Sequence, residues 1–230
     1  GHAGEAAEAW KDARQLVLVT TPGWNATQGS LSSYAREGGR WHRVAGPLPV
    51  VVGAAGAGWG LGLQPPQGDG PQKREGDNRS PAGVFRLGTA FGYAPRARTA
   101  MPYLATDAGD YCVDVAGSPL YNRIVDTREV GAAAVRGATE PMRRDLAFKG
   151  DQAYRLGFVI EQNPQNRPGG GSCVFAHLWH APDAPTAGCT AMTDAAMAQL
   201  LAWLDPSQRP VFVLLPQAAY RRLREAWRLP

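Results

Sequence analysis

The chain has 230 residues, of which 44% are hydrophobic and 19% charged, and its formal net charge is +4. This composition is typical of a globular protein and excludes an extended disordered chain. The basic residues are scattered rather than gathered in a stripe with aromatic residues, so nothing favours nucleic-acid binding. Apolar runs stay well short of the roughly 18 residues that a stable membrane span needs.

The first part of the chain predicts a helical N-terminal segment followed by strands. Residues 1–14 are rich in Ala and Glu and favour a helix, and one domain is expected over residues 15–230. Apolar runs and turn residues predict strands at Gln15–Thr21, Gly29–Arg36, Arg40–Ala45, Leu48–Val52 and Val84–Leu87. The glycine-rich stretch Gly53–Gly62 is not followed by Lys-Ser/Thr or by a helical pattern. It therefore predicts a bent strand with a close backbone approach rather than a phosphate-binding loop.

Strands also dominate the second part, and helices come late. Further strands are expected at Tyr111–Val115, Ile124–Asp126, Tyr154–Glu161, Cys173–Trp179 and Pro210–Leu215. A helical turn is expected at Glu140–Leu146, with helices at Ala195–Leu204, capped by Thr193 or Asp194, and at Gln217–Trp227. The predicted class is mainly β (α+β), with a few peripheral helices around one β-rich domain.

The stretch from Ser172 to Met192 holds two of the three cysteines and two of the four histidines. If Cys173–Trp179 is a strand, its side chains alternate, and His177 and His180 point to opposite faces. This divergence argues against a metal site with paired histidines. A structural zinc site is also disfavoured, because the chain has few cysteines and no Cys-x-x-Cys motif.

The prolines between Pro182 and Pro185 favour a loop after this strand, which can return Cys189 to the side of His177. An imidazole beside a thiol can accept its proton and so create a cysteine nucleophile. Gly188 would leave room for a substrate, and the backbone N–H groups of Gly188 and Cys189 could hold an oxyanion. The alternative is a buried structural cysteine beside a core histidine.

At these residues the sequence resembles the YkuD-type L,D-transpeptidase superfamily. That resemblance lies in His177 on a strand, a loop, the Thr-Ala-Gly-Cys run ending at Cys189, a helix and a final strand. The run Pro185–Met192 is similar to a divergent branch of the superfamily with the signature Pro-Thr-x-Gly-Cys-x-Ala-Met. Two further stretches, Lys73–Tyr93 and Cys112–Asp126, are similar to other segments of that branch.

The resemblance implies a YkuD-like β-sandwich or mixed-sheet catalytic domain. It implies a thioester on Cys189, His177 as the base, oriented by a backbone carbonyl, and peptidoglycan stem peptides as partners. Neither a metal nor an organic cofactor is implied. It also implies a periplasmic or secreted protein. The chain begins with Gly1 rather than Met, and we expect a signal peptide to have been removed.

Other residues are weaker site candidates. Trp179, His180 and Thr186 are expected to flank the site and contact substrate. For Tyr121, Asn122 and Asp126, a structural role is the alternative to substrate binding. Arg79 and Lys73 could pair with a substrate carboxylate or could belong to a solvated loop.

Three functions stay open at this point, and Cys112 and Cys173 could be either bonded or free. The chain could be a cross-linking transpeptidase, a hydrolase on the same scaffold (an L,D-carboxypeptidase or an amidase), or a wall-binding module without catalysis. In an oxidising compartment Cys112 and Cys173 could form a disulfide. Alternatively, Cys173 could be a small buried apolar residue. The sequence indicates no oligomeric state.

Overall fold

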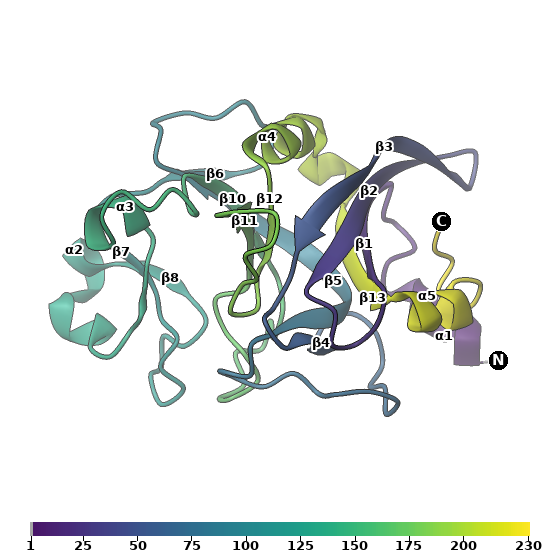
Figure 1. Cartoon of the computed structure of the whole chain (residues 1–230), viewed down its shortest axis with the longest axis horizontal. Helices are drawn as coiled ribbons and strands as arrows, with labels where there is room; N and C mark the ends of the chain where they lie inside the picture. Colours follow the sequence, from purple (N-terminus) through teal and green to yellow (C-terminus); the bar gives the residue numbers. More distant parts are fainter. Residues whose placement is uncertain (1) are drawn as a thin grey trace.

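The computed structural model describes residues 2–230, and Gly1 lies outside the described part. The strands are β1 (Gln15–Thr21), β2 (Gln28–Glu37), β3 (Arg40–Val51), β4 (Gly56–Trp59), β5 (Arg79–Gly92), β6 (Tyr103–Ala105), β7 (Asp110–Cys112), β8 (Ile124–Asp126), β9 (Glu140–Pro141), β10 (Leu156–Ile160), β11 (Phe175–Leu178), β12 (Thr190–Met192) and β13 (Val211–Pro216). The helices are α1 (His2–Glu8), α2 (Thr127–Val130), α3 (Arg144–Ala147), α4 (Asp194–Trp203) and α5 (Gln217–Leu223), with 3-10 turns η1 (Ala132–Val135) and η2 (Pro206–Gln208). The predicted mainly β class with peripheral helices is confirmed (Figure 1).

Most strands belong to one mixed sheet that closes on itself. Its order is β10-β11-β12-β3-β2-β1-β13-β5-β4, and β10 also pairs with β5. The 14-residue strand β5 hydrogen-bonds in turn with β4, β13, β10 and β6. The sequence predicted only Val84–Leu87 of it, because Gly83 and Gly88 interrupt the apolar alternation and glycine is depleted in strand interiors.

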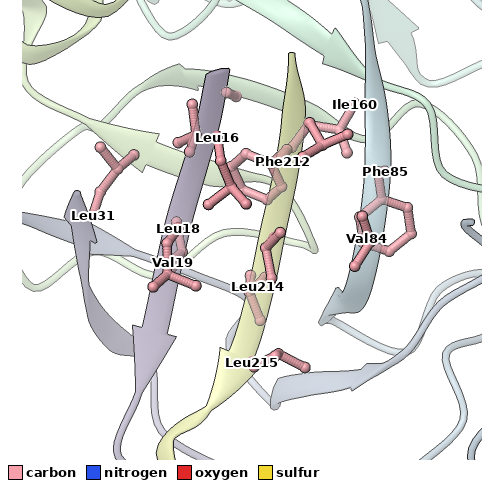
Figure 2. Close-up of a cluster of buried hydrophobic side chains, with 14 of the residues drawn as sticks. Leu16, Leu18, Val19, Leu31, Val84, Phe85, Ile160, Phe212, Leu214 and Leu215 are labelled. Atoms are coloured by element: carbon pink, nitrogen blue, oxygen red, sulfur yellow. The ribbon is translucent and has the colours of Figure 1, made fainter. Parts of the chain in front are cut away.

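The hydrophobic core lies around the parallel pair β1 and β13. Leu16 of β1 is in register with Val211 of β13, and every residue of β13 is buried. Strands buried on both faces appear in a sequence as continuous apolar runs, which is why both could be recognised. Figure 2 shows their side chains beside Phe85 of β5. The core therefore packs strands from both ends of the chain, β1 and β13, against β5, the longest strand.

The two terminal segments pack together and shorten the predicted helices. Trp10 is 1% exposed, and its Nε1 donates a hydrogen bond to the carbonyl of Trp227 at 2.9 Å. To bury this ring the chain leaves helix α1 at Glu8 instead of continuing to residue 14. Likewise α5 ends at Leu223 and not at the predicted Trp227. Among residues 2–230, no helix has the length and apolar character needed to cross a membrane.

Several predicted boundaries are wrong for local reasons. The two strands expected at Arg40–Ala45 and Leu48–Val52 form the single strand β3, because shifts of register between β2 and β3 absorb the Gly46–Pro47 step between them. The helical turn expected at Glu140–Leu146 begins as strand β9, and helix α3 starts only at Arg144. The strands β6, β9 and β12 were not predicted, because two or three residues carry no alternation.

The glycine-rich stretch contains strand β4 and makes the close backbone approach that its composition predicts. Gly56 has φ +96°, a conformation that other residues rarely adopt. A Cβ atom there would lie only 1.9 Å from the carbonyl oxygen of Trp24. Glycine at this position thus allows β4 to pass directly beside the loop that follows β1.

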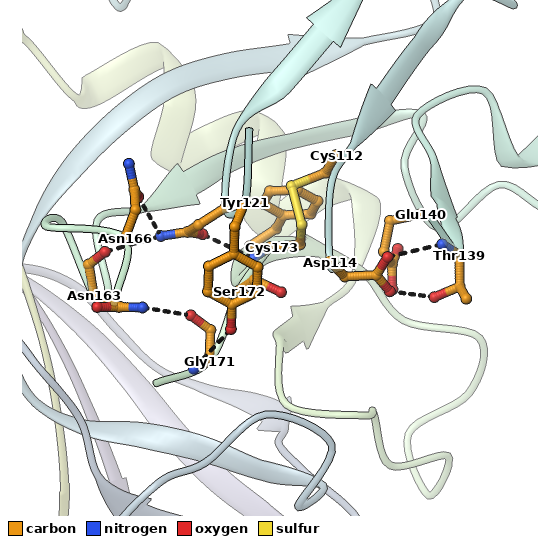
Figure 3. The surroundings of a disulfide bond; sticks show 12 residues. Cys112, Asp114, Tyr121, Thr139, Glu140, Asn163, Asn166, Gly171, Ser172 and Cys173 are labelled. Atoms are coloured by element: carbon orange, nitrogen blue, oxygen red, sulfur yellow. Dashed lines mark hydrogen bonds between the residues drawn. A yellow bond between two sulfur atoms is a disulfide. The ribbon is translucent and has the colours of Figure 1, made fainter. Parts of the chain in front are cut away.

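A disulfide joins Cys112 of β7 to Cys173, just before β11, with 5.9 Å between their Cα atoms. It attaches the small sheet β8-β7-β9 to the main sheet (Figure 3). Asn122 supports the same junction, because its Oδ1 accepts a hydrogen bond from the Cys173 N–H at 3.0 Å and its Nδ2 donates to the carbonyl of Asn163 at 2.9 Å. Of the two alternatives for these cysteines, the disulfide is the one observed, and Cys189 remains a free thiol.

Removing this disulfide should destabilise the fold. The double variant Cys112→Ala/Cys173→Ala should lose about 4 kcal/mol of unfolding free energy, the loop-closure value for a cross-link of this span. Urea denaturation of the oxidised protein and the variant, both carrying Cys189→Ser to prevent thiol exchange, measures the difference. The wild-type chain, denatured without reductant, should alkylate at one thiol and after reduction at three, whereas three before reduction would contradict the cross-link.

Candidate active site

Two adjacent parallel strands bring the predicted nucleophile and base together. β11 and β12 pair so that His177 is in register with Ala191. Cys189 immediately precedes β12, and its Sγ accepts a hydrogen bond from the Phe175 N–H at 3.3 Å. Because paired residues of parallel strands point to the same face and side chains alternate, Cys189 and His177 share a face. Both side chains line one cavity of about 180 Å³.

That cavity collects several of the predicted site residues and three other polar residues. The predicted residues that line it are His177, Trp179, His180, Thr186 and Cys189, and the unpredicted polar residues are Glu140, Arg144 and Tyr154. His177 is 7% exposed, whereas His180 is exposed at the mouth, where its Nε2 lies 3.1 Å from the carboxylate of Asp151. The expected divergence of the two histidines is wrong, because β11 ends at Leu178 before the alternation reaches His180, and both side chains line the same cavity.

The turn that carries Cys189 is fixed by hydroxyl groups. Thr186 Oγ1 donates a hydrogen bond to the carbonyl of Cys189 at 2.6 Å and accepts one from the Gly188 N–H at 3.0 Å. Ser80 on β5 donates a second hydrogen bond to the same carbonyl at 3.1 Å. The Gly188 N–H is thus already engaged, whereas we find no hydrogen bond from the Cys189 N–H to any residue in 2–230. Of the two predicted oxyanion donors, Cys189 is the one that is available.

Glycine is needed at position 188 for two reasons. Its φ of +146° lies in the region where a side chain is strained. A Cβ atom there would also lie 3.1 Å from the carbonyl oxygen of Arg79 and 3.5 Å from Lys73 Nζ. The backbone of the nucleophile turn can pack this closely against the start of β5 only because residue 188 has no side chain.

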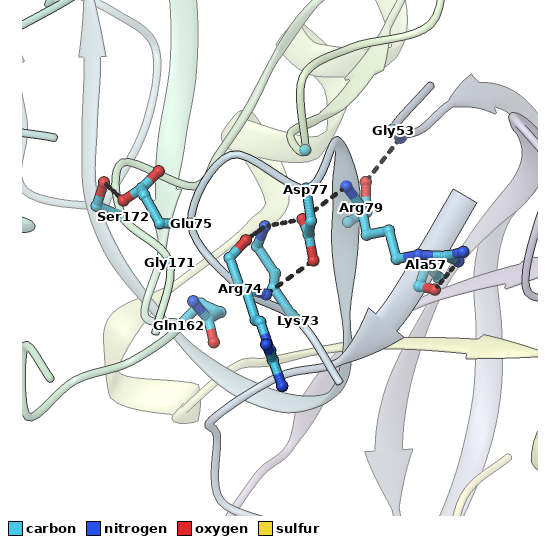
Figure 4. A network of polar contacts seen from close by, with 12 residues as sticks. Gly53, Ala57, Lys73, Arg74, Glu75, Asp77, Arg79, Gln162, Gly171 and Ser172 are labelled. Carbon is cyan, nitrogen blue, oxygen red and sulfur yellow. Dashed lines mark hydrogen bonds and ion pairs between the residues drawn. The ribbon is translucent and has the colours of Figure 1, made fainter. Parts of the chain in front are cut away.

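Lys73 and Arg79 lie outside the cavity, and their side chains bond other parts of the protein (Figure 4). The Lys73 side chain is 5% exposed, and its ammonium lies 3.0 Å from the carboxylate of Asp77. Arg79 donates from one guanidinium nitrogen to the carbonyls of Trp24 at 3.0 Å and Ala57 at 2.8 Å. These protein partners favour a structural role for both residues over a direct contact with substrate.

A backbone carbonyl orients His177. Its Nδ1 lies 2.8 Å from the carbonyl oxygen of Leu178, and because a carbonyl only accepts hydrogen bonds, Nδ1 must carry the proton. Nε2 then holds the lone pair that a general base needs. Burial lowers the pKa of His177 to about 4, so the imidazole is neutral at physiological pH.

The thiol of Cys189 is also held neutral. Its burial, and then the charge of Glu140, raise its pKa to about 12, while the hydrogen bond from Phe175 and the charge of Lys73 act in the opposite direction. The cavity therefore contains a thiol and a neutral imidazole rather than a thiolate and an imidazolium.

The unpredicted residues form one polar wall of the cavity. Tyr154 donates a hydrogen bond to Glu140 at 2.5 Å, and the centre of its ring lies 5.3 Å from that of His177. Arg144 pairs with Asp151 at 3.2 Å, and its buried Nε has no hydrogen-bond partner among the described residues. No motif marks these residues. The sequence offers one weak signal for them. Glu140 and Arg144 are charged residues within the expected helical turn, and Tyr154 is an aromatic residue at the start of the expected strand Tyr154–Glu161.

Three of the weaker candidates lie outside the cavity and support loops. The Tyr121 hydroxyl donates to Glu75 at 2.6 Å, and burial, followed by this bond, raises its pKa to about 12. Asn122 holds Cys173, as described above. Asp126 caps α2 by accepting a hydrogen bond from the Arg128 N–H at 2.9 Å. These contacts favour structural roles for all three.

One group of carboxylates has the spacing of a possible metal site. Ligand oxygens of Asp107, Asp110 and Asp126 all lie within 4.8 Å of one another. The Arg128 guanidinium already occupies this group, at 2.5 Å from Asp107 and 2.8 Å from Asp126. None of the three carboxylates lines the cavity of Cys189. The arrangement is a surface ion-pair network.

Comparison with known proteins identifies the family. The model of the YkuD family, the L,D-transpeptidase catalytic domain, matches residues 25–213, and the chain belongs to this family. The crystal structure of the helical cell shape determining protein Pgp2 from Campylobacter jejuni is similar, with 14% identity and a TM-score of 0.39. The match covers 89% of this chain, which spans about half (48%) of the Pgp2 chain. No curated protein matches the sequence.

Gly188→Ala should destabilise the protein, because its φ of +146° strains an alanine and its new methyl group would press on the Arg79 carbonyl. The expected loss is about 1–3 kcal/mol of unfolding free energy, measured by urea denaturation. Gly68→Ala is the matched control, because a Cβ atom there meets nothing within 4 Å. Equal stability of the two variants would show that the turn tolerates a side chain.

The neutral thiol predicts slow alkylation. At pH 9, iodoacetamide should modify Cys189 in the folded protein on the order of 10²–10³-fold more slowly than in urea, because a pKa of about 12 leaves little thiolate. Glu140→Gln should accelerate the reaction of the folded protein by removing a neighbouring negative charge. Equal rates in the folded and denatured wild-type chain would contradict a raised pKa.

Proposed function

We propose that the chain is a cysteine-dependent acyltransferase that cross-links peptidoglycan stem peptides as an L,D-transpeptidase. The observation that carries this proposal is that Cys189 and His177, on neighbouring parallel strands, line one cavity. Membership of the YkuD family supports it, since the family model describes an L,D-transpeptidase catalytic domain.

In the proposed reaction, the Cys189 sulfur attacks the carbonyl carbon of a stem-peptide amide while Nε2 of His177 takes the thiol proton. The available Cys189 N–H receives the developing oxyanion. Collapse of the tetrahedral intermediate breaks the carbon–nitrogen bond, and the imidazolium protonates the leaving amine. An amine of a second stem peptide then attacks the thioester, forms the new amide and releases the thiol.

The neutral states of the thiol and the imidazole favour proton transfer that accompanies the attack. Because burial raises the pKa of the thiol and lowers the pKa of the imidazole, moving the proton before the attack is unfavourable. Transfer in concert with bond formation avoids a free thiolate. His177 therefore acts as a general base and not as the stable partner of a thiolate.

Arg144 is our candidate for binding a carboxylate of the stem peptide. Its guanidinium lines the cavity, and its Nε has a hydrogen that no described residue accepts. Arginine binds carboxylates through two parallel hydrogen bonds, which would fix the orientation of a peptide. Trp179 and His180, at the same cavity, would flank the bound peptide.

A periplasmic or secreted location is part of the proposal. The disulfide between Cys112 and Cys173 supports it, because such bonds form and persist mainly in oxidising compartments.

Incubation with purified muropeptides, followed by mass spectrometry, tests the function. The wild-type chain should yield cross-linked dimers, and Cys189→Ala should yield none because it lacks the attacking sulfur. His177→Gln should be about 10²–10⁴-fold slower, the usual value of a positioned proton acceptor.

His180→Gln is the matched control, since it makes the same change at the mouth of the cavity, and it should cost much less. Undiminished turnover by Cys189→Ala would exclude the mechanism. Shortened monomers in place of dimers would identify water as the acceptor and the chain as a hydrolase, an L,D-carboxypeptidase or an amidase.

A further inference from the structure

A second and larger cavity of about 720 Å³ lies between the loop that joins β5 to β6 and helix α4. Figure 1 shows this loop reaching across the sheet towards α4. The cavity, which we call the α4 groove, shares no lining residue with the cavity of Cys189. It therefore offers a separate place for a ligand, and none of the reaction steps above makes use of it.

The floor of the α4 groove is apolar. It includes Leu156, Leu201 and Trp203, and the ring of Tyr103 closes one side. Helix α4 presents exposed alanines to the groove, including Ala198, instead of the charged residues that usually cover a surface helix. Such a floor can take the apolar parts of a peptide.

The rim of the groove is cationic. Arg96 and Arg98 are exposed and make no hydrogen bond or ion pair with any residue in 2–230. Arg155, also on the rim, lies 3.2 Å from Asp194. The lining contains no aspartate or glutamate. Because free guanidinium groups bind carboxylates in a planar, bidentate way, the groove is complementary to an anion with carboxylates.

The groove adjoins the wall of the catalytic cavity. Tyr154 lines the catalytic cavity, and the next residue, Arg155, lines the groove. Tyr93 of the groove donates a hydrogen bond from its hydroxyl to the carbonyl of Asp151 at 2.9 Å. The carboxylate of Asp151 in turn contacts Arg144 and His180 in the catalytic cavity. The groove and the catalytic cavity are thus linked through Asp151.

We infer that the α4 groove binds a carboxylate-bearing peptide segment of peptidoglycan, at a site separate from the cavity of Cys189. This assignment rests on the proposed function for the identity of the polymer. The free arginines select the carboxylates, and the apolar floor accepts the aliphatic parts of the peptide. The groove therefore anchors the domain on its polymeric substrate independently of catalysis.

Pelleting with insoluble peptidoglycan tests this inference, using the chain with Cys189→Ala to prevent turnover. Arg96→Ala/Arg98→Ala should weaken binding at least tenfold. The matched control is Arg136→Ala/Arg221→Ala, which removes the same charge from exposed arginines outside the groove and should bind like the parent. Peptidoglycan whose carboxylates have been amidated should bind the parent weakly and abolish the difference between the variants.

A second pair of variants changes the groove without removing an arginine. Ala198→Glu adds a negative charge on exposed helix surface and should weaken pelleting, whereas Ala198→Gln, of the same shape, should weaken it much less. Equal pelleting of the Arg96/Arg98 variant and its control would overturn the inference even if the wild-type chain produces dimers. Arginine-dependent pelleting by a wild-type chain without turnover would retain the groove and reject the proposed function.

Discussion

The backbone hydrogen bonds of β5 are the constraint on which the rest of the structure depends. This strand closes the main sheet by pairing with β13 on one side and β10 on the other, and its ends lie beside the turn of Cys189 and the loop of the α4 groove. Near its start, Ser80 bonds the carbonyl of Cys189. Just after its end, Tyr93 enters the loop of the α4 groove. Nucleophile turn and groove are therefore held at a fixed separation by one continuous element.

Sequence patterns predicted the parts of the fold in which local preference and tertiary packing agree. The apolar runs of β1 and β13 and helix α4, capped by Thr193, belong to this group. The patterns fail where tertiary contacts determine whether an element forms or where it ends. The burial of Trp10 ends α1 early, and β12 has only three residues, which pair because β11 and β3 lie beside them.

The residues of the candidate site likewise fall into those that the sequence identifies and those that only the fold brings together. Cys189 and His177 could be found because a short motif places both in one stretch. Glu140, Arg144 and Tyr154 could not, because they reach the cavity from distant segments that the disulfide-linked sheet and the start of β10 position. Conversely, Lys73 lies within a segment similar to the family, yet it pairs with Asp77 outside the cavity, and the sequence pattern alone does not distinguish such a structural role from contact with substrate.

The neutral state of Cys189 has a consequence for the durability of the protein. The residue packs against the hydrophobic cluster that contains both Cys112 and Cys173, so a reactive sulfur lies close to an existing disulfide. A thiolate there would attack that bond and scramble it, or would be oxidised by peroxide, since both reactions begin from the ionised form. Because the thiol keeps its proton, both reactions are slow, and the single free sulfur of the chain is protected from exchange and oxidation.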